Sequence, residues 1–219
     1  VTLMIGNVSN GQGHETAYTQ IIAERLGMPF ESIRIHQGDT DAAIYPGMTG
    51  GSRALSVGGT AVMRAAERII DKGKKLAAHL LETAEADIEF KDGRFTVAGT
   101  DRALTIGDIA KASFDMTKLP RELSPGLEET ANFLSSASTF PNGCHVVEVE
   151  IDPATGTTHL VRYTVVDDFG TVINPLLLAG QVHGGIGQGI GQALLERCVY
   201  DPASAQLVTG SFMDYCLPR

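Results

Sequence analysis

One predicted helix carries six glycines, and this feature constrains the fold more than any other part of the sequence. Asn174-Pro175 places a favoured N-cap residue before a proline, which predicts a helix from Pro175 to about Arg197. Each glycine inside a helix costs up to about 1 kcal/mol relative to alanine, so this helix must need them. Four of them share one helical face: Gly180, Gly184, Gly187 and Gly191. Either close helix packing or a flat ligand explains this face, and Gln181 and His183 are the better ligand candidates.

A second glycine segment joins a predicted strand to a predicted helix. Val1 to Val8 is predicted to be a strand, because its β-branched and apolar residues show no helical period, and Gly11-Gln12-Gly13-His14-Glu15-Thr16 follows. Helical spacing then begins at His14 and ends before Gly27, with apolar positions Ala17, Ile21, Ile22 and Leu26. Glycines let a ligand approach the backbone, and the free amides of a helix N-terminus favour an anion or a carbonyl-rich heterocycle. An ordinary strand-to-helix turn, with His14 as a capping or surface residue, is the alternative.

A third glycine segment lies in a long predicted loop, Gln37 to Gly59, after a short strand at Ser32 to His36. Gly47-Met48-Thr49-Gly50-Gly51-Ser52-Arg53 offers consecutive amides, a hydroxyl and a guanidinium, which suit a phosphate. A purely structural loop is equally compatible with this pattern. The sequence contains neither the GxxxxGK[ST] motif of phosphate-binding loops nor the GxGxxG dinucleotide motif, so both of those site types are excluded.

The remaining pattern predicts an α+β fold with mixed sheets packed on long helices. A long helix is expected from about Gly58 to Leu81, with a disturbance possible at Gly73. The other expected elements are two hairpins (88–90 with 94–97 around Asp92-Gly93, and 145–151 with 157–166 around 152–156), a short helix at 105–113 and an irregular connection at 119–136. The expected organisation is two sub-units, 1–85 and 140–219, joined by a small insertion at 86–139.

Composition and net charge limit the kinds of partner and location expected for this chain. Lys+Arg 17 against Asp+Glu 26 gives a net charge of 17 − 26 = −9, which disfavours nucleic acid. The longest apolar runs, such as Leu176 to Ala179, are far shorter than the roughly 20 residues of a membrane span. Three widely spaced cysteines without a CxxC pair argue against zinc and for a reducing compartment, so a cytoplasmic location is expected. The aspartates show no spacing typical of a metal or acid/base pair, and they suit turns and strand ends: Asp39, Asp41, Asp167, Asp168 and Asp214.

Five segments, taken together and in order, resemble the C-terminal half of the molybdenum-binding large subunit of the molybdenum hydroxylases, the xanthine dehydrogenase and aldehyde oxidase group. Large subunits of the carbon monoxide dehydrogenase type are the most similar. The resemblance spans essentially the whole chain and is carried by Gly11-Gln12-Gly13-His14-Glu15-Thr16, Gly50-Gly51-Ser52-Arg53, Asp168-Phe169-Gly170-Thr171-Val172-Ile173-Asn174-Pro175, Gly180-Gln181-Val182-His183-Gly184-Gly185 and Ser211-Phe212-Met213-Asp214-Tyr215-Cys216-Leu217-Pro218.

This resemblance implies a molybdenum-containing cofactor, molybdopterin cytosine dinucleotide, bound between this domain and a preceding one. Gln12 and Gly13 would lie near the molybdenum and pterin, Ser52 and Arg53 would hold the phosphate end, and Gln181 would contact the pterin. The whole implied cofactor-binding set is Gln12, Gly13, His14, Thr16, Gly51, Ser52, Arg53 and Gln181. The implied reaction is oxidative hydroxylation of carbon monoxide, an aldehyde or an N-heterocycle with water as oxygen source.

The resemblance also implies partners, and the sequence departs from the family's pattern in two places. An upstream domain of the same subunit would share the cofactor, and iron–sulfur and flavin subunits or domains would carry electrons away. Gly50 stands where relatives often have an aromatic residue, so substrate-channel detail is not transferred. The family's catalytic glutamate is expected beyond Arg219, so residues 1–219 contain no expected catalytic residue or metal ligand, and these residues alone are expected to be inactive. A non-enzymatic phosphate-ligand binding domain or subunit is the alternative interpretation.

Overall fold

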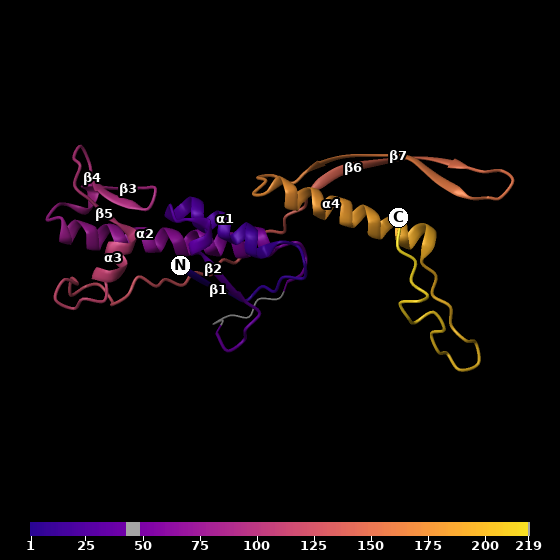
Figure 1. Ribbon diagram of the computed structural model, residues 1–219, viewed down its shortest axis with the longest axis horizontal. Helices are drawn as coiled ribbons and strands as arrows, with labels where there is room; N and C mark the ends of the chain where they lie inside the picture. Colours follow the sequence, from indigo (N-terminus) through magenta and orange to yellow (C-terminus); the bar gives the residue numbers. More distant parts are fainter. Residues whose placement is uncertain (43–48, 219) are drawn as a thin grey trace. The chain divides into compact units, whose positions relative to one another are not determined.

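The computed structural model describes residues 1–42 and 49–218, and these form two compact units, Val1–Ile173 and Asn174–Arg219 (Figure 1). Within the first unit, residues from 86–139 share a hydrophobic core with the N-terminal helices, including Phe95, Ile106 and Ile109 beside Tyr18 and Leu26. The division into sub-units 1–85 and 140–219 around an insertion stays a prediction.

A strand–helix–strand unit opens the chain. Strand β1 (Thr2–Ile5) pairs in parallel with β2 (Arg34–Gln37), and helix α1 (His14–Leu26) connects them together with a short 3-10 helix, η1 (Phe30–Ser32). Helix α1 ends where expected, because Gly27 adopts a left-handed conformation with φ 60° and donates its N–H to the carbonyl of Ala23. The expected elements of this segment are therefore confirmed, and parallel pairing places the carboxyl ends of β1 and β2 at one edge.

Helix α2 (Thr60–Leu80) packs beside α1 and is preceded by one turn of π-helix, η2 (Ala54–Gly59) (Figure 1). The prediction of a loop as far as Gly59 is wrong at this turn. Its carbonyls are engaged: Tyr18 Oη donates to Ala54 O at 2.9 Å, and Thr60 Oγ1 donates to Ser56 O at 2.6 Å. Contacts with α1 thus stabilise a helical turn that its own glycines disfavour.

Gly73 does not interrupt α2, although a disturbance there was a possibility from the sequence. The glycine is buried, and a Cβ placed on it would lie 2.8 Å from Cε1 and 3.1 Å from Cε2 of Phe95. Phe95 is fully buried and stacks at a tilt on Phe90, with ring centroids 4.6 Å apart. Gly73 therefore admits the Phe95 ring against the helix backbone.

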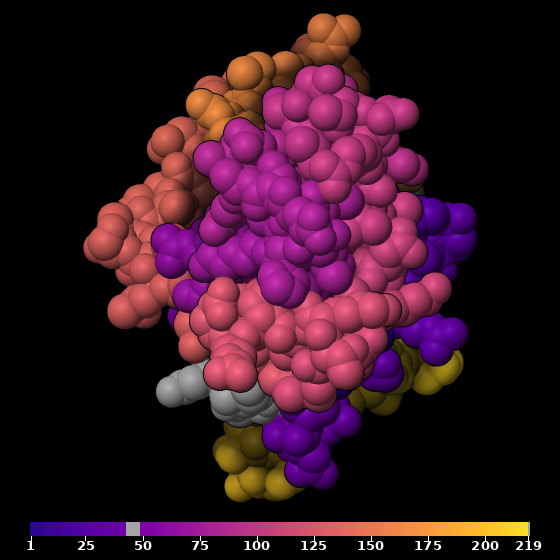
Figure 2. All heavy atoms as spheres, turned by 90° about the vertical axis from the view of Figure 1, so that its left-hand side faces the viewer, coloured from indigo at the N-terminus to yellow at the C-terminus, as the bar shows by residue number. Residues whose placement is uncertain are grey.

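A three-stranded antiparallel sheet covers this part of α2. Its strands are β3 (Ile88–Lys91), β4 (Arg94–Val97) and β5 (Ala103–Thr105), after the 3-10 turn η3 (Glu85–Asp87). The expected hairpin is confirmed, whereas β5 was not anticipated. Helix α3 (Ile106–Ala112) starts with a capping box between Thr105 and Asp108. Figure 2 shows α2, this sheet and the segment that follows α3 packed into one continuous surface (magenta to pink).

A long antiparallel hairpin completes the first unit. Strands β6 (Asn142–Ile151) and β7 (Thr158–Asp168) confirm the expected hairpin and extend it at the open end. The register shifts between Glu148 and Val149, so one residue of β7 bulges out of the ladder. Every residue of β6 is exposed, as are most of β7.

The second unit contains helix α4 (Pro175–Ile190) and a π-helical turn, η4 (Gly191–Leu195). The predicted cap is confirmed, because Asn174 Oδ1 accepts a hydrogen bond from Leu177 N at 3.0 Å and Pro175 is the first helical residue. An isolated bridge pairs Tyr200 with Leu207. None of the helices among the described residues is long and apolar enough to cross a membrane.

Candidate functional site

The first glycine segment lies at the carboxyl edge of the β1–β2 sheet. Gly11 and Gly13 both have positive φ, 101° and 77°, and Gly13 is the N-cap of α1. No side chain caps this helix, so the amides of its first turn remain available. Gln12 is half-buried, and its Oε1 accepts from the backbone N–H of Asn10, which folds the side chain over the loop. A Cβ on Gly11 would meet no atom within 4 Å, so the loop is open on that side.

His14 is buried beneath this loop, with only 6% of its surface exposed. Its Nδ1 and the Oε1 of Gln37 are buried without a hydrogen-bond partner among the described residues. Burial lowers the pKa of the His14 imidazole below 6.5, and interaction with the nearby Gln37 side chain opposes part of that shift. Gln37 points its Nε2 to Glu15 Oε1 at 3.0 Å. Neither atom has a partner at hydrogen-bond distance among the described residues, so both can form a hydrogen bond with a bound ligand.

The second glycine segment adjoins the first through its flanks. Thr49 Oγ1 accepts from Val8 N at 2.9 Å and donates to Val8 O at 2.7 Å, which ties residue 49 to the end of the first strand segment. Gly51 and Ser52 follow with φ 66° and 53°, and both are exposed together with Arg53. The Arg53 guanidinium makes no ion pair or hydrogen bond within the described ranges. Gly47 and Met48, also singled out in the sequence, lie outside the described residues.

Tyr18 ties α1 to the turn that follows Arg53. Its hydroxyl donates to Ala54 O, and burial raises its pKa to about 12, so it stays a neutral donor. The structure therefore brings the flanks of residues 11–16 and 50–53 together within one unit. Thr16, another expected site residue, is half-buried in the first turn of α1.

The third glycine segment belongs to the second unit. Gln181 and His183 are exposed on α4. A Cβ would meet no atom within 4 Å at five of its glycines: Gly180, Gly184, Gly185, Gly187 and Gly189. Gly191 differs, since a Cβ there would lie 3.5 Å from the Pro218 ring and 2.9 Å from Glu196 Oε1. One glycine of the face thus serves close packing inside the unit, and the others keep the helix surface open.

The donors and acceptors at residues 11–16, 37 and 51–53 fit a large polar cofactor. Backbone amides and a free guanidinium suit a phosphate, whereas the unpaired His14 Nδ1 and Gln37 Oε1 suit the N–H and C=O groups of a heterocycle such as a pterin. No cluster of three or more metal-ligating side chains occurs in the part of the chain that the structure describes. The amides, the guanidinium and the two polar atoms fit an organic ligand.

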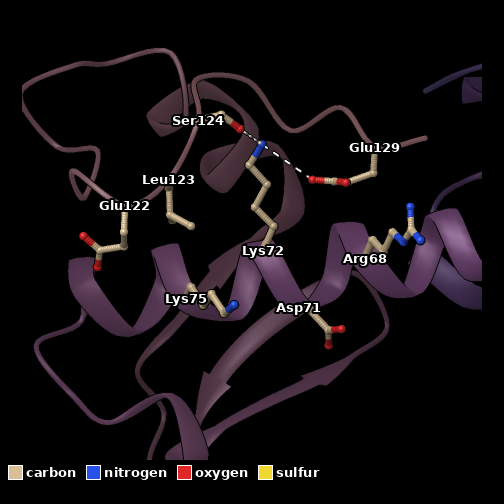
Figure 3. A pocket seen from close by; sticks show the side chains of 8 residues that line it. All are labelled: Arg68, Asp71, Lys72, Lys75, Glu122, Leu123, Ser124 and Glu129. Carbon is tan, nitrogen blue, oxygen red and sulfur yellow. Dashed lines mark hydrogen bonds and ion pairs between the residues drawn. The ribbon is translucent and has the colours of Figure 1, made fainter. Parts of the chain in front are cut away.

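A shallow hollow of about 290 Å³ lies elsewhere, between α2 and residues 122–129 (Figure 3). Lys72 crosses it, and its Nζ contacts Ser124 Oγ at 3.0 Å and Glu129 Oε1 at 3.7 Å. These bonds fix the segment 122–129 onto the helix. The Lys72 ammonium is already paired, so the hollow adds nothing to the glycine site.

Sequence reasoning did not single out Gln37 as a site residue. Its signal was its place at the end of a short strand, since parallel strands present their carboxyl ends to one ligand edge. The contact of Gln181 with the pterin stays a prediction.

Comparisons with known proteins agree with this chemistry. The carbon monoxide dehydrogenase large chain of Hydrogenophaga pseudoflava is 41% identical over 215 residues, covering 98% of this chain and 26% of that protein. The nicotine 6-hydroxylase large subunit of Paenarthrobacter nicotinovorans is 42% identical over 220 residues, covering 100% and 27%. A crystal structure of Cu,Mo-CO dehydrogenase in its carbon monoxide reduced state matches with a TM-score of 0.89 and 39% identity, over 100% of this chain and 27% of that one.

The chain thus spans about a quarter of the length of the curated relatives it matches. These relatives are oxidoreductases by name, which supports the molybdenum hydroxylase interpretation and not the alternative of a non-enzymatic phosphate-binding module. The fold class is also confirmed by the structural match. The family described as "Molybdopterin cofactor-binding domain" matches residues 1–219, and this chain belongs to that family.

Proposed function

We propose that this chain is the cofactor-binding portion of a large subunit that oxidatively hydroxylates a small substrate, namely carbon monoxide, an aldehyde or an N-heterocycle. The names of the relatives, a carbon monoxide dehydrogenase and a nicotine hydroxylase, support this range of substrates. When bound, the molybdenum cofactor supplies a two-electron oxidation in which water provides the oxygen atom. Iron–sulfur and flavin subunits or domains accept the electrons, and the enzyme works in the cytoplasm.

The buried but unpaired His14 Nδ1 and Gln37 Oε1 are the observation that carries this proposal. A burial of this kind costs about 1–3 kcal/mol per unpaired group unless a ligand completes the hydrogen bonds. Gln12, Gly13, His14 and Thr16, which lie at the N-terminal end of α1, would hold the pterin. Because burial favours the neutral His14 ring, one of its nitrogens can accept a hydrogen bond from an N–H of the heterocycle while the other donates one.

The cytosine dinucleotide form of the cofactor fits the second glycine segment. Gly51, Ser52 and Arg53 present amides, a hydroxyl and an unpaired guanidinium, the groups that recognise a pyrophosphate. Gln181 completes the set from α4 by contacting the pterin. An upstream domain of the same subunit covers the rest of the cofactor.

The test uses the complete large subunit in its holoenzyme, with Gln12→Ala and Gln181→Ala. Both variants should lose a large part of their molybdenum and of the CMP released on hydrolysis, because each removes a polar contact to the ligand without removing core packing. Gln206→Ala, an exposed glutamine in the turn near Tyr200, serves as the matched control. Molybdenum per protomer, CMP per protomer and thermal stability are measured together.

Full molybdenum and full turnover in both variants would contradict the assigned roles. Loss of molybdenum with an equal loss of thermal stability would show a folding defect instead of a binding contact. Molybdenum without stoichiometric CMP would retain the function and replace the cytosine dinucleotide by another form of the cofactor.

A further inference from the structure

The hairpin β6–β7 has two chemically different faces. Residues that pair directly across an antiparallel ladder lie on the same face. One face, called the apolar face below, carries Val147, Val149, Ile151, Leu160, Tyr163 and Val165, together with Gly143, His145, Asp167 and Thr158. The opposite, polar face carries Glu148, Glu150, His159, Arg162 and Thr164, with Cys144, Val146 and Val166 among them. On the apolar face, Val149 is 49% exposed and Ile151 60%, whereas Tyr163 and Val165 are half-buried, so the face is open mainly along β6.

The polar groups of the apolar face are already paired with one another. His145 Nδ1 lies 3.0 Å from Tyr163 Oη, and His145 Nε2 lies 3.4 Å from Asp167 Oδ1. The His145 and Tyr163 rings meet edge to face, with centroids 5.7 Å apart. Gly143 makes room for this arrangement, since a Cβ there would collide with Asp167 Oδ1. These contacts pair the imidazole with the phenol and with one carboxylate oxygen, which lowers the cost of burying this end of the face.

The polar face lacks such pairing. Glu148, Glu150 and Arg162 form no side-chain hydrogen bond or ion pair with any described residue, nor do His159 and Thr164. Charged groups without partners stay exposed to water, because burying them unpaired costs several kcal/mol. The two faces therefore differ in a way that selects one of them for burial.

The two-stranded sheet also needs a covering. An isolated hairpin is marginally stable in water, and sheets gain stability from further strands or from packing on one face. The relatives contain this whole fold within chains of which it is about a quarter, with a TM-score of 0.89 to the solved one. A large subunit of that length has ample chain outside the equivalent of residues 1–219 to provide the cover. Interfaces inside a permanent assembly are also the most apolar ones, as this face is.

We infer that the apolar face of β6–β7 is a docking surface for an apolar segment of the same large subunit, one that lies outside residues 1–219. The inference rests on the proposed place of this chain in a large subunit. The docked segment carries no charge opposite Val149, because no group on the face pairs with one. The polar face remains in water after docking.

Two matched cysteine variants test this in the holoenzyme and in the complete large subunit without its partners. Val149→Cys places a thiol on the apolar face and Val146→Cys places one on the polar face of the same strand. Both valines are well exposed here, 49% and 59%. Maleimide labelling, read at each site by mass spectrometry, should be at least tenfold slower at position 149 than at 146 in both preparations. The native Cys144, on the polar face, is an internal control for labelling.

A photo-crosslinking residue at position 149 then identifies the segment that docks on the apolar face. Crosslinks to peptides of the same subunit outside residues 1–219 support the inference. Crosslinks to an electron-transfer subunit, to an isotope-labelled second copy or to residues 1–219 overturn it. Equal labelling at 146 and 149, or protection at 149 only in the holoenzyme, overturns it as well. Molybdenum content of the unmodified enzyme is measured separately, so a cofactor-free subunit with position 149 protected would refute the proposed function and leave the docking surface standing.

Discussion

Gly73→Ala is expected to destabilise the protein, although alanine is the better helix former. The substitution gains about 1 kcal/mol of helix propensity in the middle of α2. Against this, the new Cβ would lie 2.8 Å and 3.1 Å from Cε1 and Cε2 of Phe95, and closer still to Cζ. Favourable carbon–carbon separations are about 3.5–4.0 Å, so the fully buried ring must move within a close-packed core.

The magnitude follows from these two opposing effects. Overpacking of a core costs about 1–3 kcal/mol, and contact with three ring atoms places this case at the upper end. Subtracting the propensity gain leaves a net loss of about 2 kcal/mol in the free energy of unfolding, or a Tm lower by about 4–8 °C. Urea denaturation followed by far-ultraviolet circular dichroism measures it, since the chain has no tryptophan for fluorescence.

Gly107→Ala provides the matched control. Gly107 lies in α3, is exposed, and a Cβ there would lie 3.6 Å from Thr105 Oγ1, an ordinary contact. That variant should be stabilised by about 0.5 kcal/mol. Phe95→Leu combined with Gly73→Ala should cost less than the sum of the two single changes, because the smaller side chain vacates part of the space. A Gly73→Ala protein as stable as the wild type, or an additive double variant, would refute the proposed packing.

Two further predictions concern titrating groups. Hydrogen bonds from Thr105 hold the pKa of Asp108 below its ordinary 3.8, so the cap stabilises the protein above that pH and this stabilisation is lost as the pH falls through the lower folded pKa. Asp108→Asn should therefore lower Tm at neutral pH but not in strong acid. An equal loss of Tm at both pH values would contradict the ionic character of the cap. Burial lowers the pKa of His14, so the unfolded chain gains a proton at a higher pH than the folded one, and stability should fall as the pH drops from 6.5 towards the folded pKa. NMR titration of the imidazole checks this. A midpoint at or above 6.5 would exclude the buried neutral ring.

The sequence predicts the long, regular elements well, because their signals are local. Helix α1 begins at His14 and ends before Gly27 as expected, since glycine is the favoured residue at a left-handed helix end. Asp92-Gly93 likewise predicts its hairpin from the two residues of the turn alone. The π-helical turn Ala54–Gly59 could not be predicted from local sequence, because it is stabilised by a hydrogen bond from Tyr18 on α1. Strand β5 is three residues long, too short to show alternation.

The candidate site likewise contains residues that the sequence predicts and residues that it does not. Positions such as Gly11 and Gly13 could be selected from the sequence because glycine spacing is visible there. The polar atoms of His14 and Gln37 could not be selected in this way, since His14 is on α1 and Gln37 is the last residue of β2, and their proximity depends on how the helix packs on the sheet. Periodicity indicates which residues form strands, but it does not indicate which strands pair with each other.

The turn of the β6–β7 hairpin has a consequence for the order of assembly. Asp152 accepts from Ala154 N at 2.9 Å and from Thr155 Oγ1 at 2.7 Å, and its backbone pairs with Gly156 and Thr157. All these partners lie within five residues, so the turn needs nothing else to close, and hairpins of this kind form in about 1–10 μs. Docking is slower, on a scale of milliseconds to minutes, so a nascent subunit passes through a period with a preformed apolar sheet and two free strand edges. During that interval the hairpin is exposed to intermolecular β-pairing, and a holding chaperone could act there.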